Sequence, residues 1–140
     1  RNRGRADIKG IEFEMQAEWR SGYALELAAQ LAHGDTPGDG EPLDDIPVGS
    51  VVLSLRKSLG HGYVKGRTRF FARDVRPGPT ERITPSYGVV DLGTGYRFSD
   101  RFEVIFRVRN LLDTAHPINP DVRSVIAPGI NAVAVFVARF

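Results

Sequence analysis

Apolar and polar side chains alternate along nearly the whole chain with a period of two residues. In the segment 11–19, the apolar residues Ile11, Phe13, Met15, Ala17 and Trp19 share one parity, and glutamate or glutamine stands between them. An α-helix would mix these two sets on every face because it has 3.6 residues per turn, whereas a β-strand separates them. The pattern therefore predicts strands and excludes helices as the main element of the fold.

The same alternation recurs in six further segments. They cover residues 23–32, 51–58, 64–73, 90–98, 102–109 and 130–140, the last of which is apolar on both parities except at Asn131 and Arg139. Most segments are longer than the roughly 5–6 residues typical of strands in soluble proteins. A tilted strand that crosses a membrane needs about 9–11 residues. The lengths therefore favour a membrane wall over a soluble sandwich.

The connections between the predicted strands alternate between short and long. The short ones are residues 20–22, 59–62 and 99–101, and the long ones, rich in Gly, Pro, Asp and Asn, are residues 34–46, 76–85 and 111–129. If each strand pairs with the next, all long loops lie on one edge of the sheet, as in outer-membrane barrels. The predicted fold class is all-β, an antiparallel up-and-down meander of about seven long strands that forms part of a transmembrane β-barrel.

Aromatic residues gather beside the short connections. They are Trp19 and Tyr23 at the first turn, Tyr63 after the second, Phe98 and Phe102 at the third, and Phe140 at the end of the last predicted strand. Amphipathic rings collect at membrane–water boundaries. This distribution predicts an aromatic belt along one edge of the sheet.

Basic residues largely avoid the apolar parity of the predicted strands. Those on the polar parity include Arg56, Arg67, Arg69, Arg107 and Arg109. None of them bears the roughly 2–4 kcal/mol cost of a cation that faces lipid at mid-depth. Lys9 and Lys57 break the pattern, but each lies near a predicted edge of the sheet, where its stem can reach the headgroups. The polar face is predicted to be wet and partly cationic, able to attract an anionic solute or hold an acidic plug, or simply to carry salt-bridge ladders.

Composition narrows the class of protein further. The 140 residues carry 19 Lys and Arg against 17 Asp and Glu, a formal charge of +2, which gives no general case for nucleic-acid binding. Cysteine is absent, which excludes a disulfide framework and a Cys-ligated zinc site. The longest apolar run, Ala132 to Ala138, is far shorter than the about 18 residues of a membrane-spanning helix. Because the first residue is Arg1 and not methionine, we expect an internal or C-terminal fragment, or a processed chain.

Short motifs mark both ends of the predicted sheet. Gly10-Ile11-Glu12 opens the first strand, Asn110-Leu111-Leu112-Asp113 follows the sixth, and Pro128-Gly129 precedes a last strand in which Phe136 and Phe140 share one parity. In this order and spacing, from Asp7 to Phe140, they resemble the C-terminal part of the β-barrel of TonB-dependent outer-membrane receptors. Asn110-Leu111-Leu112-Asp113 is similar to that family's Asn-Leu-Leu-Asp box. Two residues depart from the family's pattern: His116 stands where the family often has Tyr, and Ile130 stands where it often has Arg.

The resemblance implies a fold, a location and partners. Residues 1–140 would be the C-terminal segment of the barrel in a Gram-negative outer membrane, with the C-terminus periplasmic and the plug and earlier strands outside this sequence. The implied function is TonB-energised uptake of a scarce nutrient such as a ferric siderophore. The implied partners are membrane lipid, the barrel insertion machinery reading Phe136 and Phe140, a small-molecule ligand, and TonB through parts absent here. Seven strands alone would leave two unpaired edges.

Few residues offer other chemistry. His33, His61 and His116 lack metal-ligand spacing, and no nucleophile elbow or phosphate loop occurs. We therefore predict no enzyme activity, no cofactor and no metal site. The acidic loop from Asp35 to Asp45 lacks the regular spacing of a calcium loop. The candidate extracellular ligand contacts are His33, Asp35 and His116.

Two other classes of protein fit parts of the pattern. One is a small passive outer-membrane barrel, a porin-like pore with one strand missing. The other is a soluble β-sandwich binding module, which would pack the apolar stripe from Ile11 to Trp19 against a second sheet. The behaviour of that stripe in the fold distinguishes the sandwich from both membrane interpretations.

Overall fold

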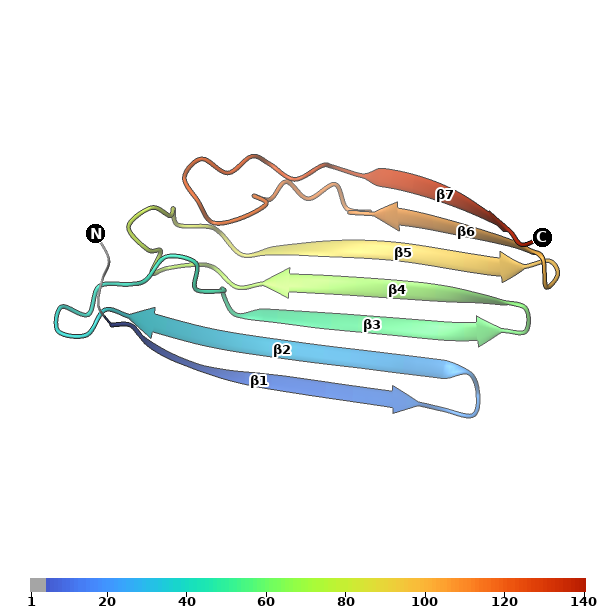
Figure 1. Cartoon of the computed structure of the whole chain (residues 1–140), viewed down its shortest axis with the longest axis horizontal. Helices are drawn as coiled ribbons and strands as arrows, with labels where there is room; N and C mark the ends of the chain where they lie inside the picture. Colours follow the sequence, from blue (N-terminus) through green and yellow to red (C-terminus); the bar gives the residue numbers. More distant parts are fainter. Residues whose placement is uncertain (1–4) are drawn as a thin grey trace.

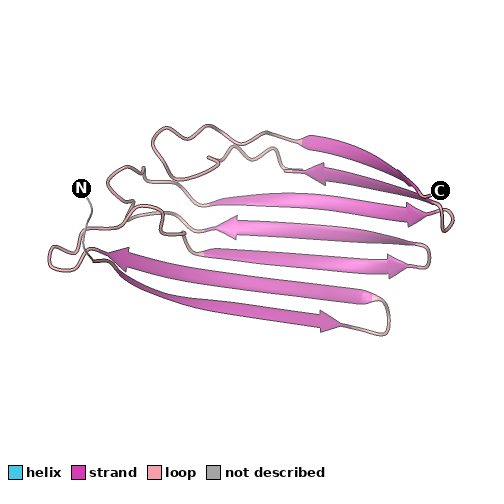
Figure 2. Cartoon of the chain, viewed as in Figure 1, coloured by secondary structure: helices cyan, strands magenta, loops and turns pink. Residues whose placement is uncertain are grey.

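The computed structural model describes residues 5–140, which form one antiparallel sheet (Figures 1 and 2). The strands are β1 (Asp7–Glu18), β2 (Tyr23–Asp35), β3 (Ser50–Leu59), β4 (Gly62–Phe71), β5 (Tyr87–Arg97), β6 (Phe102–Arg109) and β7 (Asn131–Ala138). They are hydrogen-bonded in chain order from β1 to β7, each antiparallel to the next. The predicted seven-stranded meander is confirmed.

The connections sort to opposite edges of the sheet. Figure 1 shows the three long loops, residues 36–49, 72–86 and 110–130, together at one edge, and the three short turns at the other, where β7 also ends. We call these the long-loop edge and the short-turn edge. This asymmetry follows from strict pairing of neighbouring strands, because each return of the chain reverses its direction.

The register aligns the apolar parities of neighbouring strands. Ile11 lies opposite Leu31, Leu27 opposite Leu53, and Val104 opposite Phe136. Side chains of one parity therefore form a continuous apolar face, whose members include Ile11, Phe13, Met15, Leu25, Leu27, Leu53, Leu55, Val64, Phe70, Leu92, Val104, Phe106 and Phe136. The opposite parity forms the wet face, which carries Glu12, Glu14, Glu26, Arg56, Lys65, Arg67, Arg69, Asp91, Arg107 and Arg109.

Nothing within residues 5–140 covers the apolar face. Ile11 is 69% exposed and Phe13 53%, and Val89 on the other face is the one large side chain that is fully buried in the described part of the chain. A soluble sandwich would bury the stripe from Ile11 to Trp19 under a second sheet. The sheet is also open, because β1 pairs only with β2 and β7 only with β6. The sandwich alternative therefore does not describe this fold.

The strand ends differ from the predicted bounds at several points, among them Arg73, Phe98, Ile130 and Phe140. Arg73 lies outside β4, although hydrogen bonding to the residue before β3 extends to Ala72, whose backbone N–H donates to Gly49 O at 2.8 Å. Phe98 lies in a turn with Phe102 and not in β5. Ile130 and Phe140 both lie outside β7, the former because its N–H donates to Asp113 Oδ1 at 2.9 Å. Of these boundaries, the start of β7 is the one set by a side chain distant in sequence.

Candidate functional site

Charged residues on the wet face form ion pairs between strands. Lys65 Nζ lies 3.3 Å from Glu26 Oε2, and Arg69 Nη2 lies 3.2 Å from Asp91 Oδ2. Arg139, just beyond β7, lies 3.7 Å from Glu103. Solvent-accessible pairs of this kind contribute at most about 1 kcal/mol each. Part of the wet face therefore has the salt-bridge ladder expected of a solvated surface.

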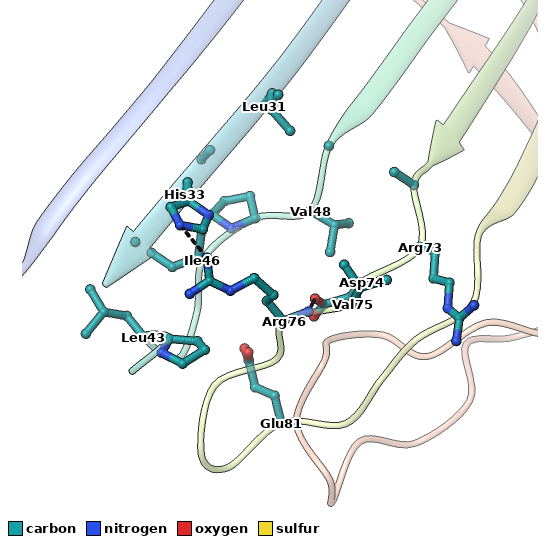
Figure 3. Close-up of a pocket in the computed structure, with 16 residues that line it drawn as sticks. Leu31, His33, Leu43, Ile46, Val48, Arg73, Asp74, Val75, Arg76 and Glu81 are labelled. Atoms are coloured by element: carbon teal, nitrogen blue, oxygen red, sulfur yellow. Dashed lines mark hydrogen bonds between the residues drawn. The ribbon is translucent and has the colours of Figure 1, made fainter. Parts of the chain in front are cut away.

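His33 and Asp35, at the end of β2, meet Arg76 from the loop 72–86. Arg76 Nη2 donates to Asp35 Oδ1 at 2.8 Å, and Arg76 Nη1 lies 2.7 Å from His33 Nε2 (Figure 3). Beside this cluster is a cavity of about 180 Å³, lined by residues of β2 and of the loops 36–49 and 72–86. The cluster therefore connects the loop 72–86 to the end of β2.

The ring nitrogen of His33 has two competing partners. His33 Nε2 lies 2.9 Å from Asp35 Oδ2 as well as 2.7 Å from Arg76 Nη1. The carboxylate can only accept a hydrogen bond and the guanidinium can only donate one, so a single ring nitrogen serves one of them at a time. Neutral His33 with its lone pair on Nε2 accepts from Arg76, which leaves Asp35 to the second guanidinium nitrogen. The cluster is therefore a satisfied polar contact between the end of β2 and the loop 72–86.

A stack of three rings lies at the long-loop edge. Tyr87, at the start of β5, stacks on Phe71 at 4.7 Å between ring centroids and on His116 at 5.0 Å. A cavity of about 270 Å³ adjoins the stack and takes lining residues from all three long loops, including Ile46, Thr84 and Ile118. This lining is largely apolar and aromatic, as in sites that hold organic ligands. His116 is not among the lining residues, but its ring stacks on Tyr87, which is, and its Nδ1 lies 3.0 Å from Thr114 O.

Asn110 connects β5 to both ends of the loop 110–130. Its side chain is buried, with Nδ2 donating to Thr114 O at 3.1 Å and to Pro128 O at 3.3 Å, while Oδ1 accepts from Thr114 N at 2.9 Å. Its backbone N–H donates to Asp91 Oδ1 at 2.9 Å. Its backbone is left-handed, with φ of 50°, a conformation that asparagine tolerates well.

Asp113 completes the loop closure that Asn110 begins. Its Oδ1 accepts the Ile130 N–H at 2.9 Å, and its own N–H donates to Asn110 O at 2.9 Å. Leu111 and Leu112 are exposed, and the Leu111 N–H donates to Val90 O at 2.7 Å. The two polar residues of the Asn-Leu-Leu-Asp segment therefore make the side-chain contacts that hold the loop at its base.

The phenylalanines of the last strand lie on the apolar parity. Phe136 is 78% exposed and lies opposite Val104, while Phe140 lies beyond β7 at the short-turn edge and is fully exposed. Neither ring has a packing partner within residues 5–140 that would explain it as part of a protein core. Both are placed where they can contact lipid or another protein.

The structure brings together two of the three predicted ligand contacts. His33 and Asp35 are adjacent, whereas His116 belongs to the separate aromatic stack. Sequence reasoning missed Arg76 and Tyr87, which hold these two clusters together, and Asp91, which contacts Arg69 and the Asn110 N–H. Tyr87 could have been noticed as an aromatic residue beside a long loop, but nothing in the sequence indicates that Arg76 reaches back to β2.

Residues 5–140 lack two other features. No group of three or more His, Cys, Asp or Glu side chains is arranged to hold a metal ion. No helix in that range is long and apolar enough to cross a membrane.

One sheet with an apolar and a charged face, and with long loops on one edge only, defines part of the wall of an outer-membrane β-barrel. The family described as TonB dependent receptor-like, beta-barrel matches residues 1–111. The chain belongs to this family of transporters and receptors, which is not a family of enzymes and whose barrels lie in the outer membrane of Gram-negative bacteria. TonB-dependent receptors act together with TonB.

Among solved structures, the chain is similar to the copper transporter OprC, with a TM-score of 0.85 and 18% sequence identity. The match covers 96% of this chain and 24% of the OprC chain. At this identity the similarity is one of fold, and this chain corresponds to about a quarter of the longer protein. No curated protein matches the sequence.

Proposed function

We propose that residues 1–140 form the C-terminal seven strands of a receptor barrel that imports a scarce nutrient across the outer membrane with energy from TonB. The observation that carries the proposal is the continuous apolar face, which runs across all seven strands. The charged strand residues lie on the wet face except near the strand ends, as at Lys9 and Lys57. Hydrocarbon around the barrel would cover the apolar face, and the wet face would line the lumen. Earlier strands of the same protein would pair with the free sides of β1 and β7.

The orientation follows from the loops. Outer-membrane barrels have short periplasmic turns and longer extracellular loops. The long-loop edge is then extracellular and the short-turn edge, with the C-terminus, periplasmic. Phe136 and Phe140 would contribute to the signal that the insertion machinery reads, and Phe140→Ala should lower the amount of folded receptor in outer-membrane fractions.

For the substrate, an organic iron chelate of the siderophore class fits the long-loop edge well. The rings of Phe71, Tyr87 and His116 and the largely apolar cavity beside them suit an organic ligand. His33 and Asp35 are less suited to contact it directly, because Arg76 already engages both. Copper is the second candidate, because OprC, which shares the fold, is a copper transporter.

The membrane assignment can be tested with spin labels on the full-length protein in lipid vesicles. Labels at Leu27 and Val104, on the apolar face, should be accessible to oxygen, which partitions into lipid. Labels at the neighbouring wet-face positions Ala28 and Ile105 lie at matched depth and should be accessible to a water-soluble nickel complex. Leu27 and Val104 shielded from oxygen would contradict the proposal.

The transport assignment requires the complete receptor in a bacterial host. Cells deprived of iron and expressing the receptor should accumulate radioactive iron supplied as a siderophore complex, and deletion of tonB should abolish the uptake. Uptake of copper but not of the iron complex would select the second candidate. Uptake that persists without TonB would indicate a passive pore, and no uptake of either would reject the assignment.

A further inference from the structure

Gly93 is an unusual residue for the middle of β5. It lies on the wet face, opposite Lys65 of β4 and Arg107 of β6, and the register is uninterrupted on both sides. Its φ is not in the left-handed region that favours glycine. Glycine in a strand interior costs about 0.5–1 kcal/mol relative to alanine. Neither backbone conformation nor a bulge explains its presence.

Steric crowding does not explain Gly93 either. A Cβ atom built there would meet Arg107 Cγ at 3.6 Å and Phe106 O at 3.7 Å, which are ordinary van der Waals distances. Gly95, two residues further along the same face, is different, because the ring of Tyr63 lies where its Cβ would be. A strand glycine that the chain itself does not need often marks the close approach of another molecule.

The space above Gly93 is a hollow surrounded by cations. A cavity of about 280 Å³ lies there, and its charged lining residues are Lys65, Arg67, Asp91, Arg107 and Arg109. The one carboxylate among them is already engaged, since Asp91 Oδ2 faces Arg69 and Oδ1 accepts the Asn110 N–H. The hollow therefore presents an excess of positive charge to any group that enters it.

Three of the four cations form no ion pair in the part of the chain that the structure describes, although Arg67 lies opposite Asp91 in the register. Lys65 pairs with Glu26, but Arg67, Arg107 and Arg109 form no ion pair with any residue from 5 to 140. Lys65 and Arg67 on β4 and Arg107 and Arg109 on β6 lie on either side of β5, so their like charges repel one another across the hollow. A guanidinium group offers a planar fork of donors that matches carboxylate and phosphate oxygens. An oxyanion in the hollow would reduce the repulsion between these cations and accept hydrogen bonds from the guanidinium groups.

We propose that the hollow over Gly93 is an anion-binding site that takes the carboxylate or phosphate group of a solute in the lumen. The inference rests on the proposed function in one respect, since the wet face must line the lumen of a barrel. It adds that the transported compound, or its complex, is anionic. The absent side chain at position 93 lets the anionic group approach the strand between the arginines.

The test uses citrate, a tricarboxylate, as probe and the purified full-length receptor in a neutral detergent at low ionic strength. Calorimetric titration should detect citrate binding to the wild-type protein. Gly93→Val fills the hollow and keeps every charge, so binding should weaken at least tenfold. Gly66→Val is the matched control, because Gly66 faces the apolar side and its added Cβ would meet Leu92 Cδ2 at the same 3.6 Å.

Charge variants test the site independently of any folding defect in Gly93→Val. Arg67→Gln and Arg107→Gln should each weaken citrate binding about tenfold and make it less sensitive to salt. Arg20→Gln, which removes a cation at the short-turn edge, should leave binding unchanged. Equal binding in all variants, or no citrate binding by the wild-type protein, would overturn the inference. The second result would indicate that another segment of the full-length protein fills the hollow.

The inference and the proposed function can fail separately. If nutrient uptake is absent but citrate binding depends on Gly93 and Arg107, the anion site stands and the transport assignment fails. If uptake is intact but citrate binding is indifferent to both positions, the transport assignment stands and the anion site is wrong.

Discussion

The turns at the short-turn edge and the loops at the long-loop edge are held by different kinds of interaction. At the short-turn edge, backbone hydrogen bonds between near neighbours close the turns, such as Gly22 N–H to Trp19 O at 2.8 Å. Lys57, whose Nζ lies 3.9 Å from the centroid of the Tyr23 ring, extends along this edge. At the long-loop edge, side chains join residues far apart in sequence, such as Arg76 to His33 and Asn110 to Pro128.

The difference separates an edge that backbone hydrogen bonds fix from an edge whose contacts depend on particular side chains. Turns closed by their own backbone need few specific side chains beyond glycine and aromatic residues. Loops closed by side chains can change their contacts, and hence their cavities, without disturbing the strands, which is why binding residues concentrate on loops. The following experiments test whether the two edges respond differently to mutation.

The largest effect on the free energy of unfolding is expected at the middle of the apolar face, with which substitutions at the two edges can be compared. Leu27→Arg should destabilise the full-length protein in lipid vesicles by about 2–4 kcal/mol, because the cation faces hydrocarbon at mid-depth. Leu59→Arg, at the short-turn edge of the sheet, should cost about 0–1 kcal/mol. Urea unfolding monitored by tryptophan fluorescence measures both. Equal costs would contradict the assignment of the apolar face to lipid.

The next largest effect is expected at the base of the loop 110–130. Asn110→Ala leaves Thr114 N–H and the carbonyl groups of Thr114 and Pro128 without their partner, which should destabilise the protein by about 1–3 kcal/mol. The control is Asn119→Ala in the same loop, whose side chain is exposed. The same unfolding assay, together with proteolysis of the loop, compares them. A control that is as damaging as Asn110→Ala would indicate that the loop is not held by Asn110.

A smaller contrast is expected between two glycines with positive φ. Gly22, with φ of 85°, lies in the first short turn, where a Cβ would meet Ser58 O at 3.3 Å. Gly22→Ala should therefore cost about 1–2 kcal/mol through a left-handed backbone that cannot relax. Gly38 also has positive φ but has nothing within 4 Å, so its loop can adjust and Gly38→Ala should cost less. Equal unfolding free energies would show that both edges are equally rigid.

The smallest effect on stability is expected at the Arg76 cluster. Arg76→Gln should change the unfolding free energy by less than about 1 kcal/mol, because the ion pair with Asp35 is partly exposed. Cleavage within residues 36–49 by a protease added to intact cells should nevertheless become faster, since Gly40 O in this loop loses its contact with Arg76 Nη2, at 3.4 Å. Arg82→Gln, a charge-matched change in the loop 72–86, should leave the cleavage rate unchanged. No difference between these two variants would remove the proposed role of Arg76 in ordering the edge.

The elements of the fold could be predicted because each signal is local. Alternation from Ile11 to Trp19 defines a strand and its faces without reference to any other residue, and the turn at Gly22 is short enough to force pairing with the next strand. The boundaries were less predictable where a distant partner decides them. Ile130 continues the apolar pattern but lies outside β7, because Asp113 takes its N–H.

The candidate sites were predictable only in part. His33 and Asp35 share a parity on β2, so their proximity follows from the strand itself. The stacking of Tyr87 on His116 does not, because it depends on the path of a loop of which the sequence shows only the composition. Gly93 lies within a recognisable strand, but its cationic surroundings come from the register of β4 and β6.

By itself, the amino-acid sequence determined the strands, their order and the division into an apolar and a wet face, because a side-chain period of two residues is a property of the extended backbone. Only the tertiary structure decided which loop side chains meet, which boundaries shift and which cations gather around Gly93. Those contacts join residues far apart along the chain, and their geometry depends on pairing register and loop path.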